Sequence, residues 1–185
     1  MLFINKTAIC ISPLSGSHDS FSFSLDPNSE IAPGVSDIVK KLGPLAKPIV
    51  YKWSLTQSLD FREQLNAGIR YFDMRVATRK HSDQVHFVHG VYGMKVEDGL
   101  RQITGFLKDH KKEVVVIDFN HFYDMTSEQH VKLLESVKSV CGEMLCLYIG
   151  VDSLSLNLLW EQGLQIIVLY HHEVRIFVIV LSTGS

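Results

Sequence analysis

The chain has 185 residues, of which 46% are hydrophobic and 21% are charged, and its formal net charge is −2. That length suits one domain with a sizeable core, and the near-neutral charge provides no general attraction to nucleic acid or to anionic lipid. The three cysteines form no Cys-x-x-Cys pair, which argues against a disulfide framework or a zinc ribbon and favours a reducing compartment. Residues 1–6 match neither a signal peptide nor a membrane span, so we expect a cytoplasmic protein without a transmembrane segment.

The first predicted strand, residues 8–12, ends at Pro13 and leads into a loop of small residues, 15–21. Glycine permits a sharp turn there, and the serines can bond to the local backbone. Taken alone, this composition is that of a surface turn. The adjacent His18 and Asp19 form a titratable pair, however, and leave a functional site as the alternative.

Residues 22–50 hold four of the five prolines and show little periodicity. We expect an irregular excursion there, with at most a short helix at 36–42. A long loop of this kind is often functional, for example as a lid, and the alternative is a simple connector.

Helices and apolar strands alternate along the rest of the chain. A helix is predicted over residues 58–68, where Ser58 can cap the start and Gly68 suits the stop. After it come a strand at 69–77, a strand at 85–89, a helix at 96–110, a strand at 113–120, a helix opened by the capping box 126–129 and ending near residue 140, a short helix at 154–162 and a strand at 164–170. This order predicts an α/β fold built on a parallel sheet.

Polar side chains gather at the ends of the predicted strands. They are His18 and Asp19 after the first strand, Asp73 and Arg75 on one face of the second, His89 at the end of the third, and Asp118 with Asn120 at the end of the fourth. An acid and an arginine on one strand face form either a simple ion pair or part of a buried site. Because the carboxyl ends of parallel strands open on one face, we expect all of these side chains to converge.

The chemistry follows from this set of side chains. Two histidines can serve as general base and general acid across one displacement. An arginine between them offers a forked, permanently charged donor to a phosphate oxyanion. The set is suited to cleaving a phosphodiester with an internal or a water nucleophile.

No strong metal signature competes with this interpretation. His86 and His89 have a spacing that could suggest zinc, but their odd separation on a strand turns the side chains to opposite faces. His121, His171 and His172 have no companion spacing. We therefore predict no metal site, and a zinc hydrolase is a distant third possibility.

Five stretches in order carry a family resemblance, namely Gly16–Ser20, Trp53–Gln57, Phe61–Arg75, His89–Gly90 and Asp118–Tyr123. They resemble the X domain of phosphatidylinositol-specific phospholipase C, and most closely the small X-domain-only proteins of animals. The resemblance runs over about residues 16–170. It implies a TIM-type (β/α)8 barrel with phosphodiesterase activity on inositol phospholipids at a membrane surface, in lipid metabolism and signalling.

The resemblance also implies a role for each site residue. His18 would be the general base that takes a proton from the inositol 2-hydroxyl, whose oxygen then attacks phosphorus. His89 would be the general acid that protonates the departing diacylglycerol oxygen. Asp19 and Asp73 would orient the histidines, and Arg75 would stabilise charge on the phosphorane-like transition state.

Two further implications concern ligands. Asp118 and Asn120 would bind substrate. In the calcium-dependent relatives, the strand that carries Arg75 here carries two acids that bind the ion, whereas the metal-independent bacterial enzymes have a guanidinium in this place. A positive side chain would repel a divalent cation, so we predict no cofactor and no calcium requirement.

The chain departs from the family at both ends of the resemblance. Residues 11–15 differ from the usual approach to the first motif, and the sequence diverges after His171. A full barrel takes about 250 residues, so we expect an incomplete one, with about half to two-thirds of the barrel. Residues 1–172 would form a partial X domain, and residues 173–185 a divergent apolar tail.

Two functions remain in competition. The first is an inositol-phospholipid phosphodiesterase that uses His18 and His89. The alternative is a catalytically weak or inactive truncated isoform with a binding or regulatory role. The sequence indicates neither which phosphoinositide is preferred nor the oligomeric state.

Overall fold

The structure is a computed structural model that describes residues 14–36, 41–42, 45–80, 82–146 and 154–172, together with the backbone of 175–178. The strand expected at 8–12 lies outside these residues, as does most of the helix expected at 36–42. The described helices are α2 (Lys47–Ser54), α3 (Phe61–Asn66), α4 (Val96–Asp109), α5 (Ser127–Cys141) and α6 (Leu156–Gln162), with short 3₁₀ turns at Ser22–Ser24 (η1) and Gly142–Met144 (η3).

One seven-stranded sheet organises these elements. Its strands are β1 (Gly16–Ser17), β2 (Tyr71–Thr78), β3 (Val85–His89), β4 (Val91–Lys95), β5 (Val115–Tyr123), β6 (Ile166–His172) and β7 (Arg175–Val178). The order across the sheet is β4-β3-β2-β5-β6-β7, and β1 pairs with β2. Helices alternate with strands along this sheet, which confirms the predicted α/β class. Among the described residues the sheet is open, so this part of the chain does not form a closed barrel.

The sheet is mixed, so the prediction of a parallel sheet is wrong for part of it. Strands β1, β2, β5 and β6 are parallel, whereas β3, β4 and β7 run antiparallel to their neighbours. Only residues 79–84 join β2 to β3, and a parallel crossover needs a dozen residues or more. A hairpin is the connection that fits this length.

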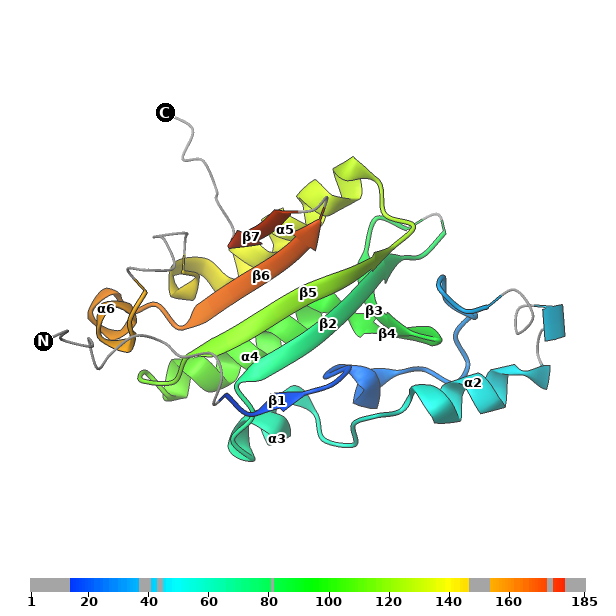
Figure 1. The fold of residues 1–185 in the computed structure, drawn as a ribbon, viewed down its shortest axis with the longest axis horizontal. Helices are drawn as coiled ribbons and strands as arrows, with labels where there is room; N and C mark the ends of the chain where they lie inside the picture. The colour runs from blue at the N-terminus through cyan, green and yellow to red at the C-terminus, as the bar shows by residue number, and fades with distance from the viewer. Residues whose placement is uncertain are drawn as a thin grey trace, which may run out of the picture.

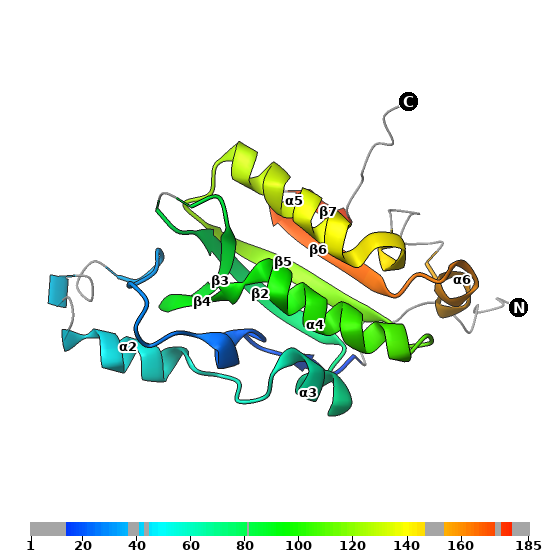
Figure 2. The same cartoon turned by 180° about the vertical axis from the view of Figure 1, so that it is seen from behind.

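Helices α4 and α5 lie side by side on one face of the sheet (Figures 1 and 2). The alternation predicted for β2 is confirmed, because Phe72, Met74 and Val76 are completely buried beneath this helical layer. Helix α4 turns Leu100 and Ile103 toward the same core. The other face of the sheet carries the alternate residues of β2 and β5, and it is the face that bears the polar groups.

The cap predicted for α5 is confirmed, and the cap predicted for α3 is wrong. Thr126 caps α5, and its hydroxyl and the Gln129 side chain complete the capping box that the sequence predicts. The cap of α3 is Asp60 rather than Ser58, because the Asp60 carboxylate accepts from Glu63 N while the Glu63 side chain accepts from Asp60 N. The two partners lie three positions apart in both boxes, which is the spacing that the reciprocal bonds require.

Two elements were not predicted. Helix α2 begins inside the stretch that was expected to be irregular. Its Pro48 is compatible with a helix because it lies in the first turn, where a missing N–H removes no hydrogen bond of the helix. Strand β4 contains Gly93 and lies between the strand and the helix that the sequence predicts at 85–89 and 96–110. A side chain at Gly93 would meet Ser24 Oγ at 2.7 Å, so the glycine permits close packing of β4 on η1.

The pairing of β2 determines where the polar groups meet. Strand β5 occupies one edge of β2 along its length, so β1 and β3 share the other edge. Strand β1 pairs with the start of β2 and β3 pairs with its end, which brings the loop after β1 and the end of β3 together beside the middle of β2. The predicted placement at strand ends is therefore confirmed for His18, Asp19 and His89. It is wrong for Asp73 and Asp118, which lie opposite each other within long strands.

Candidate active site

Asp19 is the centre of the polar cluster. Its carboxylate is completely buried, with Oδ2 2.9 Å from His89 Nδ1 and 3.1 Å from His18 Nε2, and with Oδ1 2.8 Å from Arg75 Nε. Its backbone has a φ of 44°, a left-handed conformation that aspartate tolerates better than most residues do. The tight turn after β1 thus points this carboxylate inward, toward two histidines and one arginine.

The turn is held to β2 by reciprocal bonds. Asp19 N donates to Asp73 Oδ2 at 3.1 Å, Ser20 N donates to Asp73 O at 3.0 Å, and Asp73 N donates to Ser20 Oγ at 2.9 Å. Gln64 of α3, itself buried, donates to Ser20 O at 2.8 Å. The surface-turn interpretation of this loop is therefore wrong for Asp19 and Ser20, which are both fully buried.

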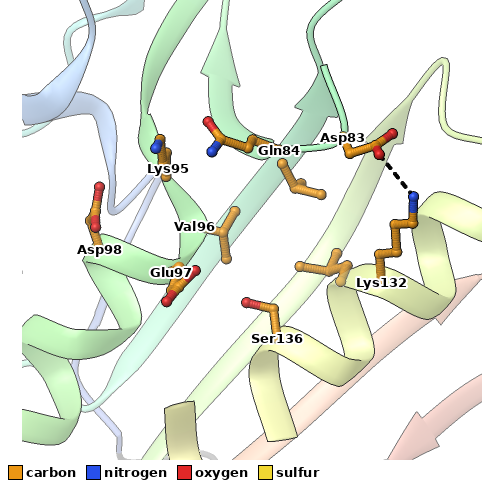
Figure 3. Close-up of a pocket in the computed structure, with 10 residues that line it drawn as sticks. Asp83, Gln84, Lys95, Val96, Glu97, Asp98, Lys132 and Ser136 are labelled. Atoms are coloured by element: carbon orange, nitrogen blue, oxygen red, sulfur yellow. Dashed lines mark hydrogen bonds and ion pairs between the residues drawn. The ribbon is translucent and has the colours of Figure 1, made fainter. Parts of the chain in front are cut away.

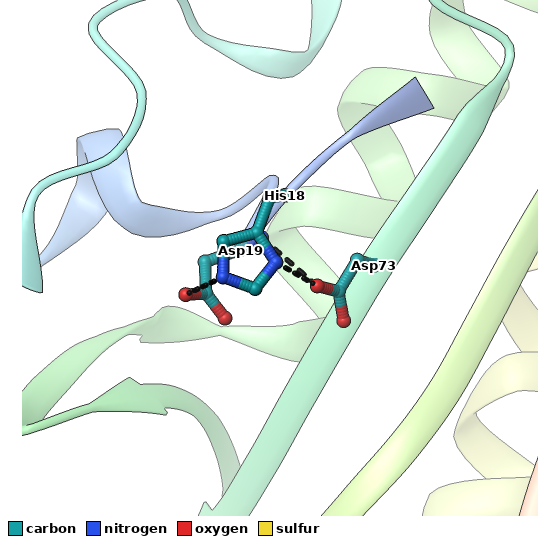
Figure 4. A group of neighbouring side chains, drawn as sticks. All are labelled: His18, Asp19 and Asp73. Carbon is teal, nitrogen blue, oxygen red and sulfur yellow. Dashed lines mark hydrogen bonds and ion pairs between the residues drawn. The ribbon is translucent and has the colours of Figure 1, made fainter. Parts of the chain in front are cut away.

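His18 lies between two carboxylates (Figure 4). Its Nδ1 is 2.8 Å from Asp73 Oδ2, its Nε2 is 3.1 Å from Asp19 Oδ2, and 63% of its side chain is exposed. A carboxylate can only accept, and a neutral imidazole has a single N–H, so the neutral ring can donate to only one of these partners. With Nδ1–H donated to Asp73, Nε2 carries the lone pair that a base needs.

The surroundings of Asp19 keep it ionised. Burial by itself raises the pKa of this carboxyl, but the hydrogen bond and charge of His89, followed by the charges of Arg75 and His18, outweigh burial and hold the pKa below its usual value. Asp19 is thus a buried anion shared by three cationic or protonatable groups. Such an anion orients each of them and compensates its charge.

A second cluster adjoins the first on the same face of the sheet. The Tyr71 hydroxyl donates to Asp118 Oδ2, and His171 Nε2 lies 2.8 Å from Asp118 Oδ1. Burial, together with the bond to Asp118, raises the pKa of Tyr71 well above its ordinary value. Asn120 connects the clusters, because its Nδ2 donates to Asp73 Oδ1 at 2.7 Å and to Asp118 Oδ2 at 3.4 Å.

The backbone explains the position of Asn120. In the pairing of β2 with β5, Met74 lies opposite Phe119 and Arg75 lies opposite His121, so Asn120 is the extra residue of a bulge. Its side-chain amide turns toward the carboxylates of both strands, and its Oδ1 is 2.7 Å from His121 Nδ1.

The structure brings together all of the site residues that the sequence indicated. They form one connected network comprising His18, Asp19, Asp73, Arg75, His89, Asp118 and Asn120. Tyr71 and His171 belong to it as well and were missed. Tyr71 could have been found, because alternation places it on the face of Asp73.

His171 had no such signal in the sequence. It reaches Asp118 because Asp118 pairs with Leu169, which puts His171 two residues further along the same face. His86, by contrast, is buried, with Nδ1 3.0 Å from Gly93 O, and lies apart from this cluster, as its position on the opposite strand face predicted.

Two pockets differ in their relation to this network. Arg75 and His89 line a pocket of about 420 Å³ together with Trp53, Ser54 and Tyr123. Another pocket, of about 340 Å³, lies between the start of α4 and α5 and is lined by none of the network residues (Figure 3). The Lys132 side chain in this second pocket is already paired with Asp83 at 3.0 Å. The pocket lined by Arg75 and His89 is therefore the candidate active site.

Three of the clustered residues could also hold a cation. His18, Asp19 and Asp73 offer ligand atoms that lie within 4.8 Å of one another. Both oxygens of Asp19 already contact cationic or protonatable side chains, however, and the Arg75 guanidinium lies within ion-pair distance of one of them. A divalent ion at this position would meet the charge of Arg75.

Comparison with known proteins gives consistent matches. The family described as "Phosphatidylinositol-specific phospholipase C, X domain" matches residues 49–169. The human "PI-PLC X domain-containing protein 3" is 43% identical over 178 residues, which cover 93% of this chain and 56% of that protein. The human "PI-PLC X domain-containing protein 2" is 44% identical over 162 residues, which cover 85% of this chain and 53% of that protein. The chain thus spans about half the length of these relatives.

Solved structures show the same fold. The phosphatidylinositol-specific phospholipase C of Listeria monocytogenes superposes with a TM-score of 0.57 at 21% identity, over 85% of this chain and 50% of that one. A mutant of the Staphylococcus aureus enzyme gives a TM-score of 0.54 at 22% identity, over 85% of this chain and 46% of that one. In the part of the chain that the structure describes, no helix is long and apolar enough to cross a membrane.

Proposed function

The chain belongs to the phosphatidylinositol-specific phospholipase C X-domain family, and on that premise we propose that it is a phosphoric diester hydrolase acting on phosphatidylinositol-type phospholipids. The observation that carries the proposal is the pair of histidines, His18 and His89, which contact the same buried carboxylate of Asp19. The cysteine pattern favours a reducing compartment, so the proposed substrate lies in a membrane that faces the cytoplasm.

His18 acts as the base in this proposal. Its exposed ring donates Nδ1–H to Asp73, turns away from Asp19, and accepts the proton of the inositol 2-hydroxyl on Nε2. The freed oxygen attacks phosphorus, and the proton stays on the ring. The exposure of His18 allows this rotation, whereas Asp73 keeps the tautomer correct.

His89 acts as the acid. Its Nδ1 faces Asp19, which leaves Nε2 to protonate the diacylglycerol oxygen as the phosphorus–oxygen bond to it breaks. The products of this step are diacylglycerol and a cyclic inositol phosphodiester. Such products connect the reaction to lipid metabolism and signalling.

Arg75 supplies positive charge where the phosphorane-like transition state gains negative charge. Its Nε is held by Asp19 at 2.8 Å, so the guanidinium is oriented before substrate binds. For this reason we propose that catalysis needs no calcium. On the neighbouring strand β5, the Asp118 carboxylate would accept hydrogen bonds from inositol hydroxyls, and the Asn120 side-chain amide would donate hydrogen bonds to them.

The test is inositol phosphate release from phosphatidylinositol by the purified chain and by two variants, His18→Ala and His89→Ala. We expect each variant to lose a factor of about 10²–10⁴ in turnover, the usual contribution of general acid or base catalysis. His110→Ala is the matched control, because His110 lies at the end of α4, outside the polar network, where its ring stacks on Phe106 and its Nδ1 is 2.8 Å from Phe106 O.

Equal release by all four proteins would refute the catalytic assignment. Binding of phosphatidylinositol without release, by the unaltered chain and the variants alike, would instead favour the alternative of a weak or inactive protein with a binding or regulatory role.

A further inference from the structure

Arg79 is a half-buried cation that has no ionic partner in the part of the chain that the structure describes. It directly follows β2 and continues the alternation of Arg75 and Ala77, so it belongs to the sheet face that bears the polar network. Its guanidinium carbon lies 5.1 Å from the centre of the Tyr92 ring, and its buried Nε donates to no acceptor among the described residues. Burial of such a donor costs free energy that a bound acceptor would recover.

Arg79 lines a pocket of about 630 Å³ that contains further hydrogen-bond donors. Lys80 and Ser82 come from the same connection between β2 and β3, and Gln129 comes from the first turn of α5. The Gln129 Oε1 accepts from Thr126 N, which leaves the side-chain amide nitrogen to donate to a ligand. An arginine fork with neighbouring donors is the usual protein arrangement for an oxyanion.

The charges around this pocket favour a ligand with a single negative charge. Arg79 and Lys80 are offset by Glu30 and Asp124, and the third acid, Asp83, is already paired with a lysine of α5. A second negative charge on the ligand would therefore meet two uncompensated carboxylates. A phosphodiester or a carboxylate carries one negative charge at neutral pH, whereas a phosphate monoester carries nearly two.

Residues 30–34 separate this pocket from the candidate active site. Ala32 N donates to Gly90 O at 2.9 Å, and the Ala32 side chain packs in one buried cluster with Ala77, which lies between the two arginines of the sheet face. Pro33 lines both pockets. This part of the stretch that was expected to be a lid or a connector thus forms a wall between two pockets.

The two arginines are too far apart to share one phosphate group. Four residues of an extended strand span about 13 Å. The guanidiniums are also held by different partners, since Arg75 lies against Asp19 and Arg79 lies against Tyr92. Phosphate groups bound in the two pockets would therefore belong to different ligands.

We propose that the pocket of Arg79 and Tyr92 is a second binding site, which takes a singly charged phosphodiester independently of the candidate active site. The Nε–H and one Nη–H of Arg79 would donate to the two terminal phosphate oxygens, with Lys80 beside them. The choice of a phosphodiester over a carboxylate rests on the proposed function, because the substrate and the cyclic product of that reaction are both phosphodiesters. The ligand is thus either the soluble product or the headgroup of another lipid.

The test observes the Arg79 side chain itself by NMR of isotope-labelled arginine Nε–H groups. Arg79→Lys identifies the Arg79 signal by its loss. We expect dimethyl phosphate, a phosphodiester without inositol or acyl chains, to shift this signal in the unaltered chain. The same shift should occur in Arg75→Met, which lacks the cation of the candidate active site.

The cyclic phosphodiester of inositol distinguishes the two sources of ligand. Tighter binding than that of dimethyl phosphate would identify the soluble product, whereas equal binding would identify the phosphodiester group alone, as a lipid headgroup carries it. Both results support the site.

Calorimetry measures the contribution of Arg79 to affinity. In the Arg75→Met background, the further change Arg79→Met should raise the Kd for dimethyl phosphate about tenfold or more, because charge-assisted hydrogen bonds are lost. Arg62→Met in the same background is the matched control. Arg62 lies on α3, its side chain is 52% exposed, and it is paired with Asp109.

Three results would overturn the proposal. They are an Arg79 signal that dimethyl phosphate does not shift, a shift that disappears in Arg75→Met, and binding of acetate or glycerol phosphate at least as tight as that of dimethyl phosphate. Failure of the proposed function would appear differently, as turnover that survives His89→Ala while the Arg79 signal still responds to dimethyl phosphate.

Discussion

The two faces of the central sheet use alternate residues of the same strands for opposite purposes. On the face covered by α4 and α5, Phe72 and Phe119 are completely buried among apolar side chains. On the other face, Asp73 and Asp118 lie opposite each other and bond to polar partners from three strands and one loop. One face supplies folding free energy, and the other holds charges that cost free energy to bury.

This comparison implies that substitutions on adjacent residues should separate stability from chemistry. A change on the helical face should alter unfolding and leave the chemistry of the folded molecules intact. A change on the polar face should alter turnover or its pH dependence with a smaller effect on unfolding.

The largest effect on stability is expected for Phe72→Ala. Removing a fully buried aromatic side chain typically costs about 3–5 kcal/mol, a large share of the stability of a single domain. Chemical denaturation followed by circular dichroism measures the loss, with Val131→Ala as the exposed control. A loss below about 1 kcal/mol would mean that Phe72 does not lie in a close-packed core.

Arg75→Met should have the largest effect on turnover after the histidine variants. Removal of a preorganised charge at the transition state typically costs a factor of about 10²–10³. Under the proposal that the guanidinium supplies this charge in place of an ion, turnover by the unaltered chain should survive EDTA. Loss of activity in EDTA that calcium restores would contradict the role given to Arg75.

Asp19→Asn tests the buried anion. The folded pKa of Asp19 lies below its ordinary value of 3.8, so ionisation contributes stability above that pH, and the contribution is lost as the pH falls through the folded pKa. We expect the variant to be less stable by about 1–3 kcal/mol near neutral pH, because its partners lose their carboxylate.

The difference between Asp19→Asn and the unaltered chain should shrink at acid pH, where Asp19 also becomes neutral. Urea titrations at several pH values measure it. A difference that stays constant down to strongly acid pH would mean that packing, rather than charge, explains the effect.

Tyr71→Phe should have the smallest effect of the four. The variant keeps the ring and removes the hydroxyl that donates to Asp118 Oδ2. A lost hydrogen bond is worth about 0.5–1.5 kcal/mol, so KM should rise severalfold while kcat changes little. A fall in kcat as large as the expected rise in KM would contradict this prediction and would mean that the Tyr71 hydroxyl takes part in the reaction itself.

The sequence contained enough to predict which polar residues meet, but not why they meet. His89 was expected beside His18 because both follow strands of a parallel sheet. It arrives there because β3 is antiparallel and ends at the middle of β2. The apolar alternation that reveals a strand is the same in both directions, so direction had to come from the short connection between β2 and β3.

The errors at finer scale have similar causes. His171 was missed because its contact depends on the register between β5 and β6, which no local pattern encodes. Helix α2 was missed because four prolines dominated the pattern of its neighbourhood, although one of them lies where a helix accepts it. Both omissions concern features that border the candidate active site.

The most direct test of the account is the fate of the phosphorus atom. Phosphorus NMR of phosphatidylinositol vesicles treated with the purified chain should show the resonance of a five-membered cyclic phosphodiester, because the 2-hydroxyl oxygen is the proposed nucleophile. The same resonance should be absent with His89→Ala and present with His110→Ala. Its absence with the unaltered chain, or its undiminished formation by His89→Ala, would contradict the assignment of His18 and His89 as base and acid.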